Sequence, residues 1–284
     1  MNAALPMTIG RARPARLAVA GAVPGPARGV LNQRLDPARF THLREAPSAA
    51  LAPWVDHFWH VAWDLQGLPD QLQQTLPHPN VHLVVEDGQA RLWGVHRARF
   101  NKPLAGRSWA FGVKFRAAAF QPFWGRPVSR LTDRSIPAAE VFGPAAEALA
   151  AHAEFPGMAV LCAQAEALLA AQLPPPDARA QAMGELVERV AADPGLTTVD
   201  QLADIAGIGV RQLQRLFGLH VGIGPKWVIA RYRLHEALAL LQGGQARPDA
   251  ELALRLGYFD QAHFVRDFKR MVGQAPAAYV KTQA

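Results

Sequence analysis

Residues 202–228 read LADIAGIGVRQLQRLFGLHVGIGPKWV, and residues 252–280 read LALRLGYFDQAHFVRDFKRMVGQAPAAYV. The two stretches repeat each other at an offset of 50 before a turn and of 51 after it, so the second turn holds one extra residue. The matched pairs are Leu202 and Leu252, Ala203 and Ala253, Gly207 and Gly257, Arg215 and Arg266, Phe217 and Phe268, Gly222 and Gly273, and Pro225 and Pro276. Such self-similarity predicts one structural unit built twice.

The first repeat predicts two short helices separated by a glycine turn. A helix over residues 200–206 ends at Gly207, because glycine adopts the left-handed backbone conformation at low cost. The next helix is expected over residues 210–219. The side chains with helical spacing, expected to face inward, are Leu202, Ile205 and Ala206 in the first helix and Leu213, Leu216 and Phe217 in the second.

The second repeat predicts the same arrangement. Pro248 suits the first turn of a helix that ends at Gly257, and Asp260 can cap the helix that follows. The inward side chains of that last helix are Phe264, Phe268 and Met271. A long helical pattern over residues 225–241 joins the repeats. Two short helices with a glycine turn make a helix-turn-helix, so the sequence predicts two such units on one linker helix.

The outward face of the second helix in each unit carries the functional prediction. Its residues are Arg211, Gln212, Gln214 and Arg215 in the first unit and Gln261, Ala262, His263, Val265, Arg266 and Lys269 in the second. Arginine and glutamine read guanine and adenine edges in the DNA major groove, and apolar side chains contact the thymine methyl. The alternative is an ordinary solvated face. Because the same kind of face recurs in two units, the pattern favours DNA reading.

This region resembles the DNA-binding domain of the AraC/XylS transcription regulators, and the run GYFDQAHFVRDFKRMVGQAPAAY is similar to the signature of that family. The resemblance implies two recognition helices in successive major grooves of duplex DNA, with RNA polymerase as a further partner. Carried over by position, base contacts fall to Arg211, Gln214, Arg215, Gln261, Ala262, His263, Val265 and Arg266. Three positions depart from the family, where Ser or Thr is frequent: Gly209, Gly224 and Ala275.

Composition sets the broad class. A chain of 284 residues with half of them apolar suggests two ordinary domains, and no apolar run is long enough to span a bilayer. The formal net charge is +7, but residues 181–284 hold twelve basic and ten acidic residues, so DNA affinity must come from placed contacts. Cys162 is the single cysteine, which fits a reducing, cytoplasmic setting and a buried structural thiol rather than a redox sensor.

The predicted fold class is α+β: a strand-rich amino-terminal domain with flanking helices, then an all-α domain of two helix-turn-helix units joined by a linker helix. The expected segments are a disordered basic tail over 1–29, a regulatory domain over 30–172, a proline-rich linker over 173–180 and the DNA-binding domain over 181–284. Arg11, Arg13 and Arg16 before a short apolar run superficially resemble a signal peptide, but Gly21 and Pro24 break that run.

Strands are predicted in the regulatory domain from alternating apolar and aromatic residues. They begin at Val55, Val81 and Arg107, and the second is followed by a turn at Asp87-Gly88 and a return strand. Residues 76–81 and 100–106 are expected to be turns, and helices follow, among them 158–173. The Trp-rich opening strand, the LPHPN turn and the GVKFRAAAF segment resemble, less specifically, the amino-terminal domains of some AraC-type regulators, which implies a sensing role.

Two residue sets in this domain invite a ligand interpretation. Five histidines, a common type of metal ligand, gather within forty residues, at His57, His60, His78, His82 and His96. No CxxC or HExxH motif accompanies them, and residues 57 and 60 would lie on opposite strand faces, so structural histidines are favoured over metal. Most aromatics are expected in the core, while Trp59, Trp93 and Phe115 are candidates for an effector pocket.

No catalytic motif is apparent, so the sequence predicts a regulator that is not an enzyme and holds no cofactor. A DNA-repair chemistry based on a zinc-bound cysteine cluster is excluded by the single cysteine. Two interpretations of the front domain stay open. It responds to a small-molecule effector, or it serves only for homodimerisation or structure; a metal- or redox-responsive regulator is the remaining alternative.

Overall fold

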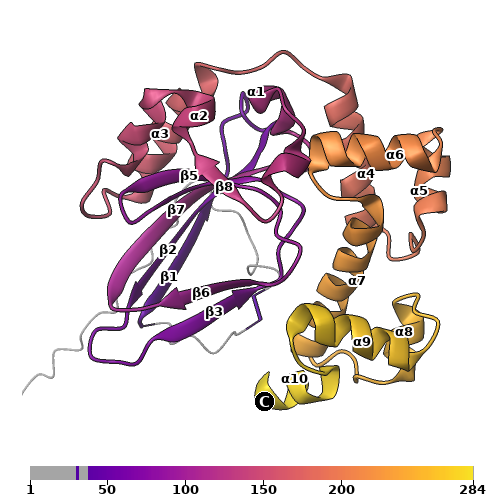
Figure 1. Cartoon of the computed structure of the whole chain (residues 1–284). Coiled ribbons are helices and arrows are strands. Elements are labelled where there is room, and N and C mark those ends of the chain that lie inside the picture. The colour runs from indigo at the N-terminus through magenta and orange to yellow at the C-terminus, as the bar shows by residue number, and fades with distance from the viewer. Residues whose placement is uncertain (1–29, 32–37, 284) are drawn as a thin grey trace, which may run out of the picture.

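The computed structural model describes residues 30–31 and 38–283. The predicted tail over residues 1–29 lies outside the described residues. Figure 1 shows strands and short helices on one side of the molecule and the carboxy-terminal helices on the other. The α+β class predicted from the sequence, with a strand-rich first half and a helical second half, is confirmed.

The front half contains a six-stranded sheet in the order β1-β2-β7-β4-β5-β8 and a separate two-stranded sheet, β3-β6. Every pairing in both sheets is antiparallel. The strands are β1 (Phe40–Glu45), β2 (Val55–Asp64), β3 (Gln71–Thr75), β4 (His82–Glu86), β5 (Gln89–Trp93), β6 (Phe100–Leu104), β7 (Arg107–Phe115) and β8 (Ser135–Pro137).

Alternation along the strands gives the six-stranded sheet two different faces. One face is apolar, with Phe58, Leu83 and Phe111 completely or almost completely buried. Short helices cover it: α1 (Gln121–Trp124), η1 (Val128–Leu131), α2 (Ala139–Phe142), η2 (Pro144–Ala150) and α3 (Met158–Ala170). The other face carries polar and aromatic side chains, among them His57, Trp59 and Lys114.

The predicted strands at β2, β4, β5 and β7 are confirmed, and Asp87 and Gly88 form the expected turn with positive φ values of 49° and 70°. The prediction of a turn over residues 100–106 is wrong, because residues 100–104 form β6. Pro103 pairs with Leu72 in a sheet of only two strands, where a proline can turn its missing donor to the unpaired edge. The polar strand β3 gave no apolar alternation from which to predict it.

The second half is helical from Ala178 onward. Its elements are α4 (Ala178–Ala192), α5 (Val199–Ala206), α6 (Val210–Leu216), the π-helix η3 (Phe217–Val221), α7 (Pro225–Gln242), α8 (Ala250–Arg255), α9 (Gln261–Val272) and α10 (Pro276–Gln283). In Figure 1, α7 runs from the first helix-turn-helix unit, α5 and α6, to the second, α8 and α9. The predicted linker helix is thus confirmed. Within the described residues, no helix has the length and apolarity that a membrane crossing needs.

Three details of the helical half differ from the prediction. The helix expected over 210–219 is α-helical only to Leu216 and continues as a π-helix. Pro248 precedes α8 instead of opening it, because Asp249 is the N-cap and accepts a hydrogen bond from the Leu252 amide. Ile205 is 39% exposed. The inward position beside Leu202 is taken by Ala203, which is buried.

The cores of both helix-turn-helix units include side chains from the front half. Val95 and Ala118 belong to the cluster formed by α4 and the first unit. Leu31 and Leu76 belong to the cluster formed by α7, α10 and the second unit. Burial of apolar surface therefore holds the front half against each unit separately.

Candidate nucleic-acid interface

The first helix-turn-helix unit is fixed by a cap and a compact core. Thr198 and Gln201 form a capping box at the start of α5. The Gln201 amide donates to the Thr198 hydroxyl, and the Thr198 amide donates to the side-chain carbonyl of Gln201. Gly207 ends α5 with a φ of 64°. Leu213 and Phe217 are fully buried, as predicted. The turn and the core together orient α6.

The predicted reading face of the first unit is exposed. Arg211, Gln212, Gln214 and Arg215 all lie on the solvent side of α6, opposite the buried Leu213 and Leu216. The N-cap of α6 is Gly209, and no side chain caps that helix, in agreement with the departure noted in the sequence. The free side chains are long, polar and directed away from the core, which is the geometry that groove reading requires.

The second unit is fixed by two aspartate caps. Asp249 caps α8, and Asp260 caps α9 by accepting a 2.6 Å hydrogen bond from the His263 amide. Phe264 and Phe268 are fully buried and Met271 nearly so, as predicted. An aspartate N-cap stabilises a helix both through the hydrogen bond and through the favourable interaction of its charge with the helix dipole.

The predicted reading face of the second unit is only partly free. Gln261, Ala262, Arg266 and Lys269 are exposed. Val265 is half-buried and packs against the core of this unit, and the His263 side chain is 46% exposed and lies 3.7 Å from Asp267. Four of the six predicted positions are therefore open to solvent, and two share their surface with neighbouring side chains.

The front half contacts equivalent points at the ends of both recognition elements. Gly222 and Gly273, which match in the repeat, have the same backbone conformation, with φ of 93° and ψ of −9°. The Thr132 hydroxyl donates a 2.6 Å hydrogen bond to the Gly222 carbonyl. The Arg99 guanidinium donates a 2.6 Å hydrogen bond to the Val272 carbonyl and lies against Gly273. The front half thus touches a matched glycine in each unit, although the two accepting carbonyls, of Gly222 and Val272, are offset by one residue in the repeat.

A third contact joins the front half to the linker helix. The Arg97 carbonyl accepts hydrogen bonds from the Trp227 indole, at 3.2 Å, and from the Arg231 guanidinium, at 2.7 Å. Arg231 is fully buried beneath the Trp227 ring, 4.4 Å from the ring centroid, and burial lowers its pKa to about 9. These residues cannot be identified from the sequence, because nothing in local spacing shows which arginine meets a carbonyl 134 positions away.

Of the three effector candidates, the structure brings two together. Trp59 lies over Gly112, and its indole donates a 3.3 Å hydrogen bond to Nδ1 of His82. Trp93 pairs with His82 across the β4–β5 ladder, so both tryptophans flank the same histidine. Phe115 lies on the opposite face of the sheet, buried against Phe120 and Phe123.

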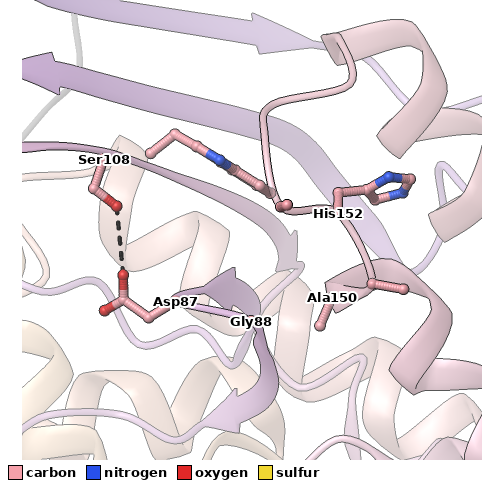
Figure 2. Close-up of a pocket in the computed structure, with 8 residues that line it drawn as sticks. Asp87, Gly88, Ser108, Ala150 and His152 are labelled. Atoms are coloured by element: carbon pink, nitrogen blue, oxygen red, sulfur yellow. Dashed lines mark hydrogen bonds between the residues drawn. The ribbon is translucent and has the colours of Figure 1, made fainter.

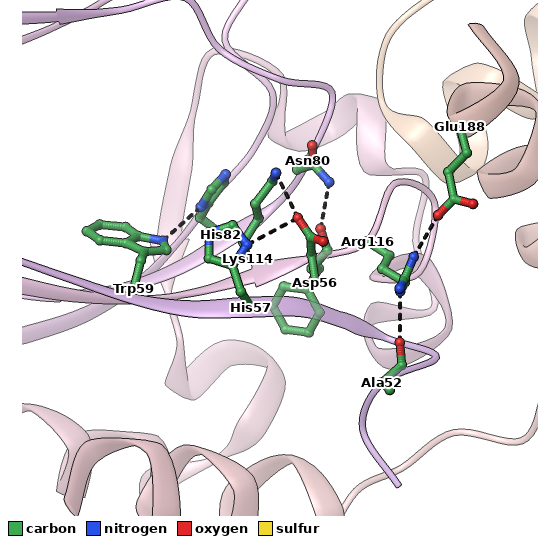
Figure 3. A network of polar contacts seen from close by, with 10 residues as sticks. Ala52, Asp56, His57, Trp59, Asn80, His82, Lys114, Arg116 and Glu188 are labelled. Carbon is green, nitrogen blue, oxygen red and sulfur yellow. Dashed lines mark hydrogen bonds and ion pairs between the residues drawn. The ribbon is translucent and has the colours of Figure 1, made fainter. Parts of the chain in front are cut away.

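A charged network continues from this aromatic group (Figure 3). Asp56 lies 2.8 Å from the Lys114 ammonium and 3.2 Å from the His57 ring. Burial by itself would raise the pKa of Asp56, but the His57 and Lys114 contacts outweigh it and hold this pKa well below the usual range. Burial lowers the pKa of His82 to about 3, so its Nδ1 is free to accept the Trp59 hydrogen bond.

A pocket of about 380 Å³ opens elsewhere, between the β4–β5 turn and the segment after η2. Figure 2 shows Asp87 and His152 on opposite sides of it, and the Ser108 hydroxyl hydrogen-bonds Asp87 at 3.4 Å. Trp109 also lines it, and none of the three effector candidates does. The sequence predicts Asp87 only as a turn residue and gives no sign of this pocket, whose lining comes from three separate segments.

The remaining histidines and the cysteine have structural surroundings. His60 is buried and stacks on Phe155 at 3.8 Å, and burial lowers its pKa to about 4. His78 stacks on His235 of α7 at 4.1 Å. Cys162 is buried beside Glu45, and burial raises the pKa of its thiol to about 12, as the prediction of a structural thiol requires. Within the described ranges, no group of three or more His, Cys, Asp or Glu side chains is arranged to hold a metal.

Comparison with known proteins gives two matching family models. Residues 202–282 match a Helix-turn-helix domain, and residues 43–137 match a Domain of unknown function (DUF6597). An uncharacterized HTH-type transcriptional regulator of Haemophilus influenzae is 33% identical over 84 residues, which is 30% of this chain and 28% of the relative. HTH-type transcriptional regulator MtrA of Neisseria gonorrhoeae is 30% identical over 102 residues, 35% of this chain and 33% of the relative.

The chain therefore spans about a third of the length of the curated relatives it matches. Among solved structures, the C-terminal domain of AraT, a response regulator from Geobacillus stearothermophilus, is 24% identical with a TM-score of 0.32, covering 37% of this chain and 84% of that one. ToxT from Vibrio cholerae is 10% identical with a TM-score of 0.41, covering 80% and 98%.

The second half thus contains a domain of the helix-turn-helix class. More particularly, that domain is of the AraC type, and the matches confirm the resemblance to AraC-family regulators that the sequence indicated.

Proposed function

We propose that this protein is a sequence-specific DNA-binding transcription factor of the AraC type. The observation that carries the proposal is the repeated geometry of α6 and α9. Each follows a glycine turn, buries equivalent side chains and exposes arginine and glutamine, and both units are attached to α7. Two such helices on one rigid linker suit successive major grooves on one face of the duplex.

The exposed side chains have distinct proposed roles. Arg215 and Arg266, which occupy matching positions of the repeat, dock to guanine or to phosphate. Gln212, Gln214 and Gln261 suit adenine, and Ala262 suits a thymine methyl. Arg211, His263, Val265 and Lys269 complete the interface, with the lysine contacting phosphate. These are binding roles, so the proposal includes no catalytic step.

The front half is proposed to act as the regulatory domain, over residues 30–172, on a reader over residues 181–284. Its signal is a small molecule or homodimerisation, and its output is a change in DNA affinity or in contact with RNA polymerase in the cytoplasm. The aromatic and charged face around Trp59, Trp93 and Lys114 is the proposed effector region. The Thr132 and Arg99 contacts support a route from that domain to both recognition elements.

The test is a titration of the full chain with duplexes selected from a random-sequence pool and with unselected random DNA, at two salt concentrations. The proposal expects affinity for selected duplexes about a thousandfold or more above that for random DNA. Equal affinity for both pools, with only a salt-sensitive background, would remove the sequence-specific part of the proposal.

Arg266→Ala refines the test. If Arg266 reads guanine, the variant loses about 1–3 kcal/mol at one base position and tolerates other bases there. If the variant instead loses the same affinity for every duplex, Arg266 contacts phosphate. Arg247→Ala, in the segment between α7 and α8, serves as a charge-matched control and should bind as the unchanged chain does.

A further inference from the structure

One large apolar side chain of the second unit lies almost wholly in solvent. Phe259 is 90% exposed, and the next most exposed large apolar residue of the described chain, Leu254, reaches only 64%. Leaving a phenyl ring in water forgoes one of the larger gains available from burial. The position therefore calls for a physical reason.

A loose turn does not explain this exposure, because both neighbours of Phe259 are held. Tyr258 is buried, its amide bonds the Ala253 carbonyl at 2.9 Å, and the Arg233 guanidinium lies 3.8 Å from its ring centroid. Asp260 caps α9 through the 2.6 Å bond to the His263 amide. The turn thus holds the phenyl side chain outward.

The repeat shows that Phe259 has no counterpart in the first unit. One residue, Ile208, separates Gly207 from the N-cap Gly209, whereas two residues separate Gly257 from the N-cap Asp260. Ile208 is half-buried and packs on the core of its unit, as Tyr258 does in the second. The extra residue of the second turn is therefore the exposed phenylalanine.

We infer that Phe259 contacts a thymine methyl group in the major groove beside α9, which extends the proposed DNA-binding function and rests on it. The amino-terminal residues of a recognition helix meet the base edges, and Phe259 directly precedes the cap of α9 and its exposed Gln261 and Ala262. An apolar side chain recognises thymine through its methyl group. The same unit exposes the cations Arg255, Arg266 and Lys269, which suit a polyanion better than an apolar protein surface.

The test uses the full chain and duplexes that it selects from a random-sequence pool. Phe259→Ala should weaken binding to the selected duplex by about fivefold or more, while Phe259→Leu, which keeps an apolar side chain, retains most of the affinity. Because the side chain is exposed, the melting temperature should not change. Leu72→Ala, a 50% exposed apolar position on β3, is the matched control and should leave DNA binding unchanged.

A second arm identifies the contacted group. Replacing single thymines by uracil deletes only the methyl group. One such replacement should therefore weaken DNA binding by the wild-type protein and leave DNA binding by Phe259→Ala unchanged. The inference is overturned, while the proposed function stands, if Phe259→Ala binds the selected duplex as tightly as the wild-type protein does, or if it loses the same affinity for random DNA. Unchanged binding to the selected duplex would leave a protein partner as the occupant. If the unchanged chain selects no duplex, both fail together.

Discussion

In the first helix-turn-helix unit, α6 spans seven residues, has no side-chain cap and passes into a π-helix. In the second, α9 runs for twelve residues from an aspartate cap. The two units nevertheless share core features, since Phe217 and Phe268 are both fully buried and both recognition elements end at glycines of identical conformation. The repeat therefore preserves the packing and varies the turn, the cap and the helix length.

The difference teaches where each unit obtains its stability. α9 has a side-chain cap, Asp260, whereas α6 has none, and the core around α6 includes α4 and the front-half residues Val95 and Ala118. A change in the front half can consequently reach the first unit through its core. It can reach the second through Leu31, Leu76 and the Arg99 hydrogen bond.

The largest expected effect tests whether the two cores are equivalent. Phe217→Ala and Phe268→Ala should each lower the free energy of unfolding by about 3–5 kcal/mol, because each removes a fully buried ring and leaves a cavity. Denaturant unfolding measures both losses. A loss below about 1 kcal/mol in one unit would show that the cores are not equivalent.

The matched glycines give the next effect. Gly222→Ala and Gly273→Ala should each cost about 1–3 kcal/mol, because both positions have a positive φ and the added methyl meets Val128 in one case and Arg99 in the other. Thermal unfolding of both variants checks this. Gly218→Ala, where the added methyl meets nothing within 4 Å, is the control, and an equal loss there would contradict the explanation.

Acid should affect the first unit through His220, which is buried and has a pKa that burial lowers. The unfolded chain then binds a proton more readily than the folded one, so stability falls as pH drops below about 6.5, by at most about 1.4 kcal/mol per pH unit for this group. His220→Leu should reduce the slope of stability against pH below 6.5, relative to the unchanged chain. An identical slope in both proteins would contradict this role.

The smallest effects concern the caps. Asp260→Ala should destabilise the protein by about 1 kcal/mol, and Gly209→Ser should stabilise it by about a few tenths of a kcal/mol. Gly209 has the extended backbone of an N-cap and room for a side chain, since an added Cβ meets nothing within 4 Å. Chemical denaturation of both variants measures the pair. A change in the free energy of unfolding of the opposite sign, for either variant, would contradict the proposed difference between the capped helix α9 and the uncapped helix α6.

The features predictable from the sequence are the ones that depend on local spacing. Helical periodicity and the repeat correctly placed Leu213, Phe217, Phe264 and Phe268 inside, and the outward arginines and glutamines followed from them. Alternation likewise identified β2 and β7.

The features that were missed depend on contacts between distant segments. β6 includes a proline and acquires its strand character from pairing with β3. The contacts of Arg97, Arg99 and Arg231 depend on how the front half lies against α7 and α9, which local spacing does not show. Residue type alone groups Phe115 with Trp59 and Trp93, and only the sheet register shows that Phe115 lies on the other face.

The most direct test of the central claim is base-resolution interference mapping of the full chain on a selected duplex, compared for the unchanged chain, Arg215→Ala and Arg266→Ala. If both helix-turn-helix units read DNA, modification should interfere with binding at two groups of bases about one helical turn, or about 10 base pairs, apart. Each variant should lose contacts in a different group. Two results would contradict this: both variants lose contacts to the same bases, or the wild-type protein contacts only one group of bases. In either case the two units do not read DNA as a pair.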